Sequence, residues 1–337
     1  MLSVAELAAV RTALHSGFTA ADGGDVTTLL DDFGWADMLA SDPGPAVAAV
    51  FGLLGSTGAT AGTLGDVMRV GLSELSWPAS TVLIPPPSRR WSPPAAVSDD
   101  AVTVDALCIA PPAAGLAAVA AQAPDGALRL ALVAVDRLDR APADGLDPWL
   151  GLVRLRGTLP ATDLAAGEIA VTAWRDALSW GRLALAAQLT GLVEASLTLA
   201  ADHARARCQF GRPVGTFQAV QHRLADIHVA LEAARATVDA AVESCRPAAP
   251  SGDSFPAQPD AVAAMVAKSM AGRAATVAAA NALQVLAGIG FTWEHPLHRY
   301  QKRGLVLDRL LGASRNLPEA IGAALVARGE IPTLVDL

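Results

Sequence analysis

The sequence predicts a mostly α-helical protein with an N-terminal helical domain (residues 1–76), a reduced β domain (residues 77–170) and a C-terminal four-helix bundle (residues 171–337). Three observations lead to this fold class. Glycines interrupt short helical patterns in the first part, and prolines surround short β-like runs in the second. Long apolar stripes with helical spacing run through the third part.

The composition excludes several classes of protein. Of the 337 residues, 52% are hydrophobic and 17% are charged, which favours an ordered globular protein over a disordered one. The net charge is −8 and no basic stripe stands out, so no nucleic-acid partner is expected. Three widely spaced cysteines suit neither a disulfide framework nor a metal knuckle, and no signal peptide is evident. We therefore expect a cytoplasmic protein.

The first two parts differ in their turn residues. In residues 1–76, glycines such as Gly23, Gly24, Gly55 and Gly58 separate helical patterns, which predicts several short helices. Residues 77–170 contain prolines at 85–87, 93–94 and 111–112, together with β-like runs at 128–135 and 152–159. This punctuation predicts a small sheet with loops.

The C-terminal part has the clearest periodicity. Apolar residues recur at spacings of three and four on residues 217–231, which predicts one helix, and residues 185–200 predict the helix before it. Residues 261–286 predict a third helix ended by Gly288 and Gly290, and a further helix is expected after Pro296. Residues 246–260 are the expected loop between the second and third helices. The longest apolar stretch, residues 183–200, contains Gln188 and Glu194, and predicts a buried core helix with no membrane span.

Two segments carry recognisable chemistry. RCQFGRP at residues 207–213 is followed by FQAVQH at residues 217–222, and QVLAGIGFTWEHPL lies at residues 284–297. Together they resemble the signature of the acyl-CoA dehydrogenases, in which an Arg-x-Gln-Phe-Gly turn joins two bundle helices and a Gly-Gly-x-Gly-Phe loop presents a glutamate. The resemblance is specific over residues 171–310 and weak elsewhere.

The resemblance implies that the chain binds FAD through the bundle. A planar guanidinium can donate two parallel hydrogen bonds to pyrophosphate oxygens, and side-chain amides can add neutral donors. Glycines let a ligand approach the backbone closely. The alternative is that these residues have no role in binding: the arginine faces solvent and the glycines only cap a helix. The residues implied as cofactor-binding are Arg207, Gln209, Phe210, Gln218, Gln284 and Gly288.

Glu294 is the implied catalytic base. In the family, the matching glutamate removes the α-proton of an acyl-CoA thioester while a hydride leaves the β-carbon for the flavin. Apolar neighbours would raise the pKa of such a carboxylate if water were excluded. Some members place the base just before an arginine of the first bundle helix. That arginine is Arg182, expected to contact substrate, but Trp180 and Gly181 precede it. Alternatively, Glu294 only stabilises the start of the helix near Pro296.

The departures from the family pattern point to a partner. The Thr-Glu-Pro-x-x-Gly-Ser-Asp-like stretch that holds the flavin ring is absent; residues 77–82 run into the prolines at 85–87 instead, and Ala287 replaces a glycine. The chain thus resembles the short subunit of actinobacterial heterotetrameric acyl-CoA dehydrogenases. Expected partners are an acyl-CoA substrate, such as a steroid side-chain thioester in lipid β-oxidation, a longer dehydrogenase subunit, and electron-transfer flavoprotein.

Other interpretations stay open at this point. The chain could be a self-sufficient homo-oligomeric dehydrogenase with a divergent β domain, or a helical assembly protein without chemistry. His222 and Asp226 are four residues apart, a spacing that metal sites use, but no third ligand accompanies them and no metal is expected.

Overall fold

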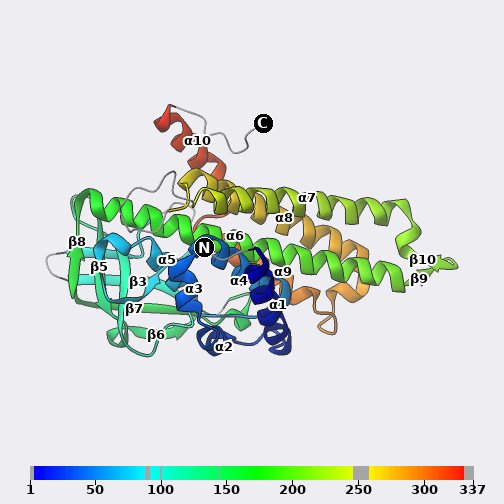
Figure 1. Ribbon diagram of the computed structural model, residues 1–337, viewed down its shortest axis with the longest axis horizontal. Coiled ribbons are helices and arrows are strands. Elements are labelled where there is room, and N and C mark those ends of the chain that lie inside the picture. The colour runs from blue at the N-terminus through cyan, green and yellow to red at the C-terminus, as the bar shows by residue number, and fades with distance from the viewer. Residues whose placement is uncertain (1–3, 88–91, 99–100, 144, 246–257, 330–337) are drawn as a thin grey trace.

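The computed structural model describes residues 4–87, 92–98, 101–143, 145–245 and 258–329. A group of N-terminal helices lies beside a β-sheet, and long C-terminal helices extend from the sheet to a protruding hairpin (Figure 1). The prediction of a mostly α fold with a sheet between two helical regions is confirmed.

Helices of 6 to 17 residues build the N-terminal region. Gly23, Gly24 and Gly58 lie between helices as predicted, but Gly55 does not separate two helices, because it lies inside α4 (Pro43–Thr57). Phe18 and Leu30 are buried in the common core. The turns that follow the first and fourth helices are tied together, because Val26 N donates to Thr60 O at 2.8 Å and Thr60 N donates to Gly24 O at 3.0 Å. The helices are α1 (Val4–Ala20), α2 (Thr27–Asp32), α3 (Trp35–Ser41), α4 (Pro43–Thr57), α5 (Leu64–Val70) and the 3-10 turn η1 (Ser73–Leu75).

The middle region is an eight-stranded sheet with the order β6-β7-β3-β2-β4-β5-β8, in which β1 pairs with β4 in parallel. The runs predicted at residues 128–135 and 152–159 are β5 and β7, so both predictions are confirmed. The 3-10 turns η2 (Val135–Arg137) and η3 (Pro148–Leu150) lie between strands. The strands are β1 (Ala79–Leu83), β2 (Ala95–Ser98), β3 (Ala101–Ile109), β4 (Leu116–Gln122), β5 (Leu128–Ala134), β6 (Asp139–Pro142), β7 (Leu152–Pro160) and β8 (Asp163–Ala165).

The C-terminal region differs in one respect from the expected bundle of four long helices. Three helices in the described part are long: α6 (Gly167–Ala206), α7 (Gln218–Glu243) and α8 (Ala261–Leu286). The chain after Pro296 forms two short helices, α9 (Leu297–Arg309) and α10 (Leu317–Arg328), because Leu311 and Gly312 take φ angles of 55° and 110° and end the helical path. The predicted loop at residues 246–260 lies mostly outside the described residues.

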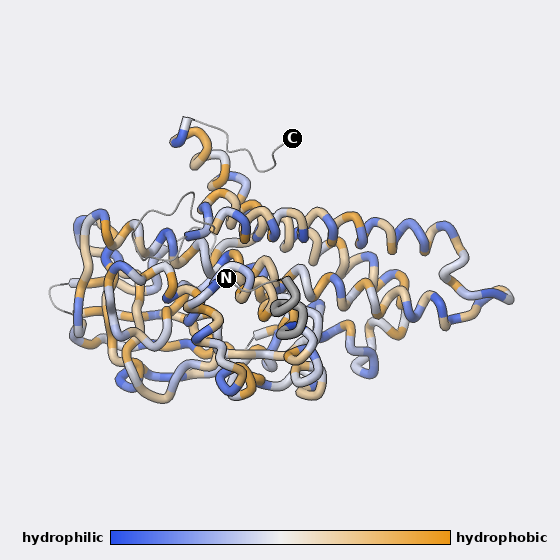
Figure 2. The backbone as a smooth tube through the Cα atoms, viewed as in Figure 1, coloured by the Kyte–Doolittle hydropathy of each residue, from blue (hydrophilic) through white to orange (hydrophobic). Residues whose placement is uncertain are grey.

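Helix α6 is the centre of the molecule. Its crossing with α4 is close because glycines face each other: a Cβ added at Gly55 would lie 2.0 Å from Gln188 O, and one at Gly191 would lie 2.1 Å from Gly52 O. By length and composition, α6 and the segment Ala261–Phe291 are apolar enough to cross a membrane; 78% and 39% of their apolar windows are buried inside the protein. Figure 2 shows the hydrophobic centre of the molecule and the more hydrophilic hairpin end.

Candidate functional site

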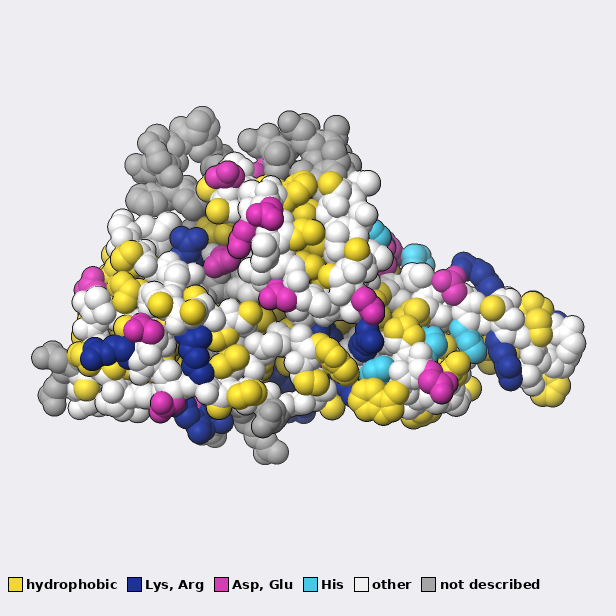
Figure 3. Space-filling model, turned by 90° about the horizontal axis from the view of Figure 1, so that it is seen from below, with side chains coloured by type: hydrophobic (Ala, Val, Ile, Leu, Met, Phe, Trp, Pro, Cys, Tyr) yellow, Lys and Arg dark blue, Asp and Glu magenta, His cyan; other side chains and the backbone are white. Residues whose placement is uncertain are grey.

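Both predicted motifs lie at one end of the bundle. Helices α6 and α8 run toward this end and α7 starts there, so the segments that follow α6 and α8 come together (Figure 1). Arg223 Nη1 on α7 donates to Asn281 Oδ1 on α8 at 2.9 Å. Burial lowers the pKa of His295, and the nearby His203 adds to the effect, so the turn after α8 lies beside the last turn of α6. Histidine and basic side chains gather toward this end in Figure 3.

Arg207 follows α6 directly and presents an available guanidinium. Its backbone is held in place, since its N–H donates to His203 O at 2.8 Å and its carbonyl accepts from Val214 N at 2.7 Å. Its side chain is exposed and forms no ion pair with a described residue. Gln218, the first residue of α7, is exposed at the same end. A fixed backbone with a free cation and a neighbouring amide suits an anionic ligand.

The hairpin after α6 is a tight turn with an aromatic tip. Strand β9 (Cys208–Gln209) pairs with β10 (Arg212–Pro213), and the two turn residues Phe210 and Gly211 have φ angles of 52° and 77°. Phe210 is 92% exposed and meets the edge of Phe217 at 6.2 Å. The guanidinium of Arg212 lies 4.3 Å from the centre of the Phe217 ring. Gln209 is also exposed.

The end of α8 corrects one prediction. The helix stops at Ala287, which has φ 52° and ψ −135°, and neither glycine serves as the terminator. The two glycines of the following 3-10 turn η5 (Ala287–Phe291) have different surroundings. A Cβ at Gly290 would lie 3.0 Å from Leu283 Cδ1, whereas a Cβ at Gly288 would meet nothing within 4 Å. Packing inside the chain therefore explains Gly290 and leaves Gly288 free to face a ligand, beside the exposed Gln284.

Glu294 lies in the exposed turn between η5 and α9. Its carboxylate forms no hydrogen bond with a described residue. Phe291 and Trp293 are 75% and 71% exposed, so these apolar neighbours do not desolvate Glu294 within this chain. Nor does Glu294 cap the next helix, because His295 Nδ1 accepts from Leu297 N at 3.2 Å.

Arg182 lies away from this end of the bundle, beside a cavity. Its Nε donates to Leu311 O at 3.0 Å, and burial lowers its pKa to about 10. The cavity has a volume of about 440 Å³, and Glu319, which is exposed, supplies the carboxylate among its described lining residues. Besides Arg182, Leu311 and Glu319, the wall includes the proline run at residues 85–87, Arg309 and Asn316.

The structure does not bring Glu294 and Arg182 together. His295 lies near His203, and Arg182 lies on the same helix α6, about 30 Å away at a rise of 1.5 Å per residue. A base and a substrate-binding arginine that act on one thioester must be adjacent. Within one chain, these two residues therefore belong to different sites.

The wall of the Arg182 cavity is held by a lysine that the sequence analysis did not assign to the site. Lys268 is fully buried in α8, and its Nζ donates to Asp308 O at 3.0 Å and to Gly312 O at 3.3 Å. Ser314 N donates to Asp308 Oδ1 at 3.1 Å. Burial lowers the pKa of Lys268 to about 8; Asp308 opposes this effect and Arg182 reinforces it. Lys268 is one of two lysines in the chain and lies inside an apolar helical stretch, a signal that could have marked it.

Comparison with known proteins places this geometry in a family. Residues 171–326 match the family described as acyl-CoA dehydrogenase, C-terminal domain. These residues belong to the acyl-CoA dehydrogenase family. Over 181 residues the chain is 34% identical to acyl-CoA dehydrogenase IpdE2 of Mycobacterium tuberculosis, covering 54% of this chain and 50% of that protein. The chain thus spans about half the length of the curated relatives it matches.

Solved structures extend the likeness to the whole fold. The Tcur3481-Tcur3483 steroid ACAD superposes with a TM-score of 0.77 and 24% identity, covering 96% of this chain and 98% of that chain. The ChsE4-ChsE5 complex from Mycobacterium tuberculosis gives a TM-score of 0.72 and 21% identity, with 99% of each chain covered. The predicted acyl-CoA dehydrogenase-like fold is confirmed.

The proline run at residues 85–87 lines the Arg182 cavity. Proline has no backbone N–H, so this segment offers no main-chain donors to a flavin ring. His222 and Asp226 are exposed on α7, and the described residues contain no group of three or more histidine, cysteine or acidic side chains arranged to hold a metal ion.

Proposed function

We propose that this chain is the short subunit of a heteromeric, flavin-dependent acyl-CoA dehydrogenase. The observation that carries the proposal is the separation of two half-sites. One end of the bundle presents Arg207 with exposed amides, while the Arg182 cavity, far along α6, is lined in part by prolines, which lack a backbone N–H, and has only the exposed Glu319 as a carboxylate among its described lining residues. Each half-site needs complementary groups from another subunit.

The bundle end suits the phosphates of FAD. FAD, when bound, accepts the hydride that leaves the β-carbon of the acyl group. Arg207 would bind pyrophosphate oxygens through its guanidinium fork, and Gln209, Gln218 and Gln284 would donate amide hydrogen bonds. Phe210 at the exposed hairpin tip reaches away from the bundle, toward a partner. Gly288 lets the cofactor approach the turn.

We place the base of the reacting site on the longer partner. Glu294 lies with the residues assigned to the phosphates, about 30 Å along the bundle from Arg182. It remains this chain's own candidate only if a partner surface covers the turn and excludes water. Arg182, half-buried and paired with a backbone oxygen, is positioned to bind an oxygen of the substrate.

The proposed substrate is an acyl-CoA with a bulky, steroid-like acyl group, oxidised at its α,β-carbons in the cytoplasm. Two fold neighbours support this choice: one is a steroid ACAD, and the other is a complex of two differently named chains. By family resemblance, electron-transfer flavoprotein would reoxidise the flavin. A self-sufficient dehydrogenase is the second candidate, and a helical assembly protein without chemistry is the third.

The test is to purify the chain alone and together with a longer dehydrogenase subunit, and to measure flavin absorbance per chain. We expect a colourless protein alone and roughly one flavin for each pair of unlike chains in the complex. Arg207→Ala should weaken flavin binding about tenfold or more, the value of a charged hydrogen bond. Arg205→Ala is the matched control, because Arg205 is exposed two residues before Arg207 and pairs with Asp202. Full flavin occupancy of the chain alone would contradict the proposal.

A further inference from the structure

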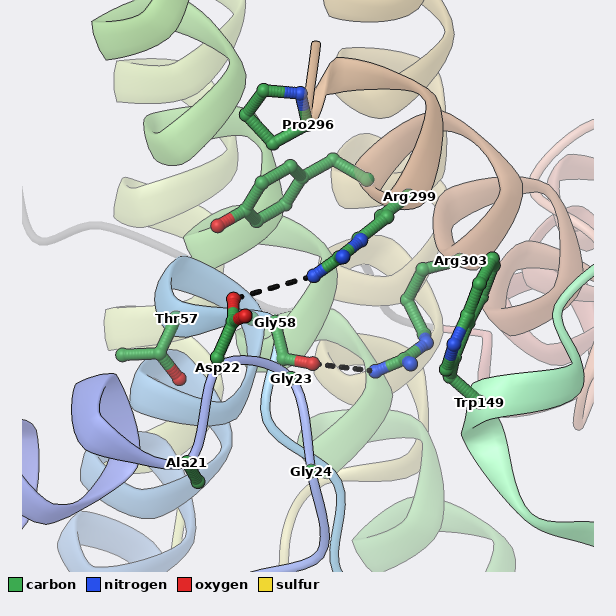
Figure 4. A pocket seen from close by; sticks show the side chains of 12 residues that line it. Ala21, Asp22, Gly23, Gly24, Thr57, Gly58, Trp149, Pro296, Arg299 and Arg303 are labelled. Carbon is green, nitrogen blue, oxygen red and sulfur yellow. Dashed lines mark hydrogen bonds and ion pairs between the residues drawn. The ribbon is translucent and has the colours of Figure 1, made fainter. Parts of the chain in front are cut away.

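A separate cavity of about 320 Å³ lies between the N-terminal helices, η3 and α9 (Figure 4). None of its lining residues belongs to the bundle-end set or to the Arg182 cavity. Its volume falls at the lower end of the range for small-molecule sites. Its wall includes backbone turns, one exposed tryptophan and arginines from α9: Gly23, Gly24, Gly58, Trp149, Arg299 and Arg303.

The floor of this cavity is backbone. Asp22, Gly23 and Gly58 have φ angles of 45°, 83° and 73°, so both turns are in the left-handed region that favours glycine. A Cβ at Gly23 would lie 3.8 Å from Arg299 Nη1, and one at Gly58 would lie 3.7 Å from the Tyr300 ring. The glycines therefore keep side chains out of the cavity and let a ligand lie against the main chain.

Two arginines of α9 enter the cavity with different roles. Arg303 is buried, pairs with Asp147 and donates to Gly58 O at 3.3 Å, so its charge is already compensated. Arg299 extends across the cavity to Asp22, with Nη1 and Oδ1 3.3 Å apart (Figure 4). The side chains of this pair are 46% and 90% exposed, and such surface pairs contribute little free energy. An anionic ligand could therefore replace Asp22 as the partner of Arg299.

Trp149 gives the cavity an aromatic wall. It is 43% exposed, and its ring lies 5.8 Å from both Arg299 Cζ and Lys302 Nζ. These cations stand at the outer limit of cation–π range. His298 lies on the same helix, with its ring centre 6.3 Å from that of Trp149. An exposed tryptophan beside two cations matches a ligand that combines a planar ring with an anionic group.

We propose that this cavity binds an adenosine phosphate, either as a free nucleotide or as the nucleotide end of coenzyme A. The base stacks on Trp149, the phosphate takes Arg299 from Asp22, and the sugar lies on the turns at Gly23 and Gly58. Lys302 is not one of the lining residues; its Nζ lies 5.8 Å from the Trp149 ring and 3.8 Å from the Trp293 ring, and adds a nearby positive charge. The inference goes beyond the flavin proposal, because no residue of the flavin set lines this cavity.

The experiment is isothermal titration calorimetry of the full chain with 3′,5′-ADP, AMP, coenzyme A and pantetheine, which lacks the nucleotide. We expect 3′,5′-ADP and coenzyme A to bind and pantetheine not to bind. If AMP binds as tightly as 3′,5′-ADP, the site serves free nucleotides; if only the 3′-phosphorylated ligands bind, it serves coenzyme A. Either result supports an adenosine phosphate site.

Variants locate the binding. Arg299→Ala and Trp149→Leu should each weaken 3′,5′-ADP binding at least tenfold, and Lys302→Ala should weaken it severalfold. Arg205→Ala, an exposed arginine on α6, should leave binding within twofold of wild type. Arg299, Trp149 and Lys302 are all partly exposed, so circular dichroism should show folded variants. Absence of nucleotide binding by the wild-type chain, or binding that survives both Arg299→Ala and Trp149→Leu, would overturn the inference.

Discussion

Arg182 on α6 donates a hydrogen bond from Nε to the backbone oxygen of Leu311, 3.0 Å away, across the break between α9 and α10. Lys268 on α8 holds the same break through Asp308 O and Gly312 O. Two cations from different helices thus fix one turn, and that turn forms a wall of the Arg182 cavity. The geometry of the cavity depends on contacts between residues 40 to 129 positions apart in the chain.

Lys268 makes stability depend on pH in an unusual direction. Its folded pKa is about 8, below the unfolded value of 10.5, so the unfolded chain binds more protons between these values. Stability should therefore rise with pH across this window. From pH 7 to pH 9.5, we expect the free energy of unfolding of the wild type to gain about 2 kcal/mol relative to Lys268→Met. Urea unfolding at both pH values measures this.

The control for this prediction is Lys302→Met, which removes the other lysine of the chain from a partly exposed site. It should follow the wild-type pH dependence. If the free energies of unfolding of wild type and Lys268→Met changed in parallel with pH, Lys268 would not titrate in this range.

Ala287 takes a backbone conformation that suits glycine. At φ 52° and ψ −135° its Cβ is strained, at a cost of about 1–3 kcal/mol. Ala287→Gly should therefore raise the free energy of unfolding by about 1 kcal/mol. Ala280→Gly, at an exposed position inside α8, should lower it by about 1 kcal/mol. Urea denaturation of both variants decides; a loss of stability in both would mean that Ala287 is unstrained.

Gly288 and Gly290 should respond differently to substitution. Gly290→Ala places a Cβ 3.0 Å from Leu283 and should lower the melting temperature, whereas Gly288→Ala should leave it unchanged because its Cβ meets open space. In the heteromeric complex, Gly288→Leu should reduce flavin content severalfold. Equal flavin content in wild type and Gly288→Leu would remove Gly288 from the cofactor site.

Glu294→Gln tests which subunit carries the base. Because Glu294 is exposed and distant from Arg182, we expect kcat of the complex to stay within about threefold of wild type, where loss of a general base costs about 10²- to 10⁴-fold. The measurement is acyl-CoA oxidation under saturating substrate. A loss in the larger range, with normal flavin content, would return the base to this chain.

The local features of the fold could be predicted from the sequence. The helix at residues 261–286 has the predicted limits, and the β-runs at 128–135 and 152–159 form strands, because periodicity and turn residues act over short spans. The bundle-end residues could also be named, because Arg207, Gln218 and Gly288 lie in contiguous motifs. What ended α8 could not, since the strained φ of Ala287 has no signal in residue type.

The tertiary structure alone decided which of these residues share a site. The sequence suggests Glu294 as the base and Arg182 as a substrate-binding residue of one site. In the structure, however, about 30 Å along α6 separates them. Likewise, nothing in the sequence pairs Lys268, a single basic residue in an apolar helix. Folding brings its amine to the end of α9 and to the turn that follows it. Periodicity fixes the path of each helix, but burial, pairing and distance depend on contacts between distant segments, and those form only when the helices pack.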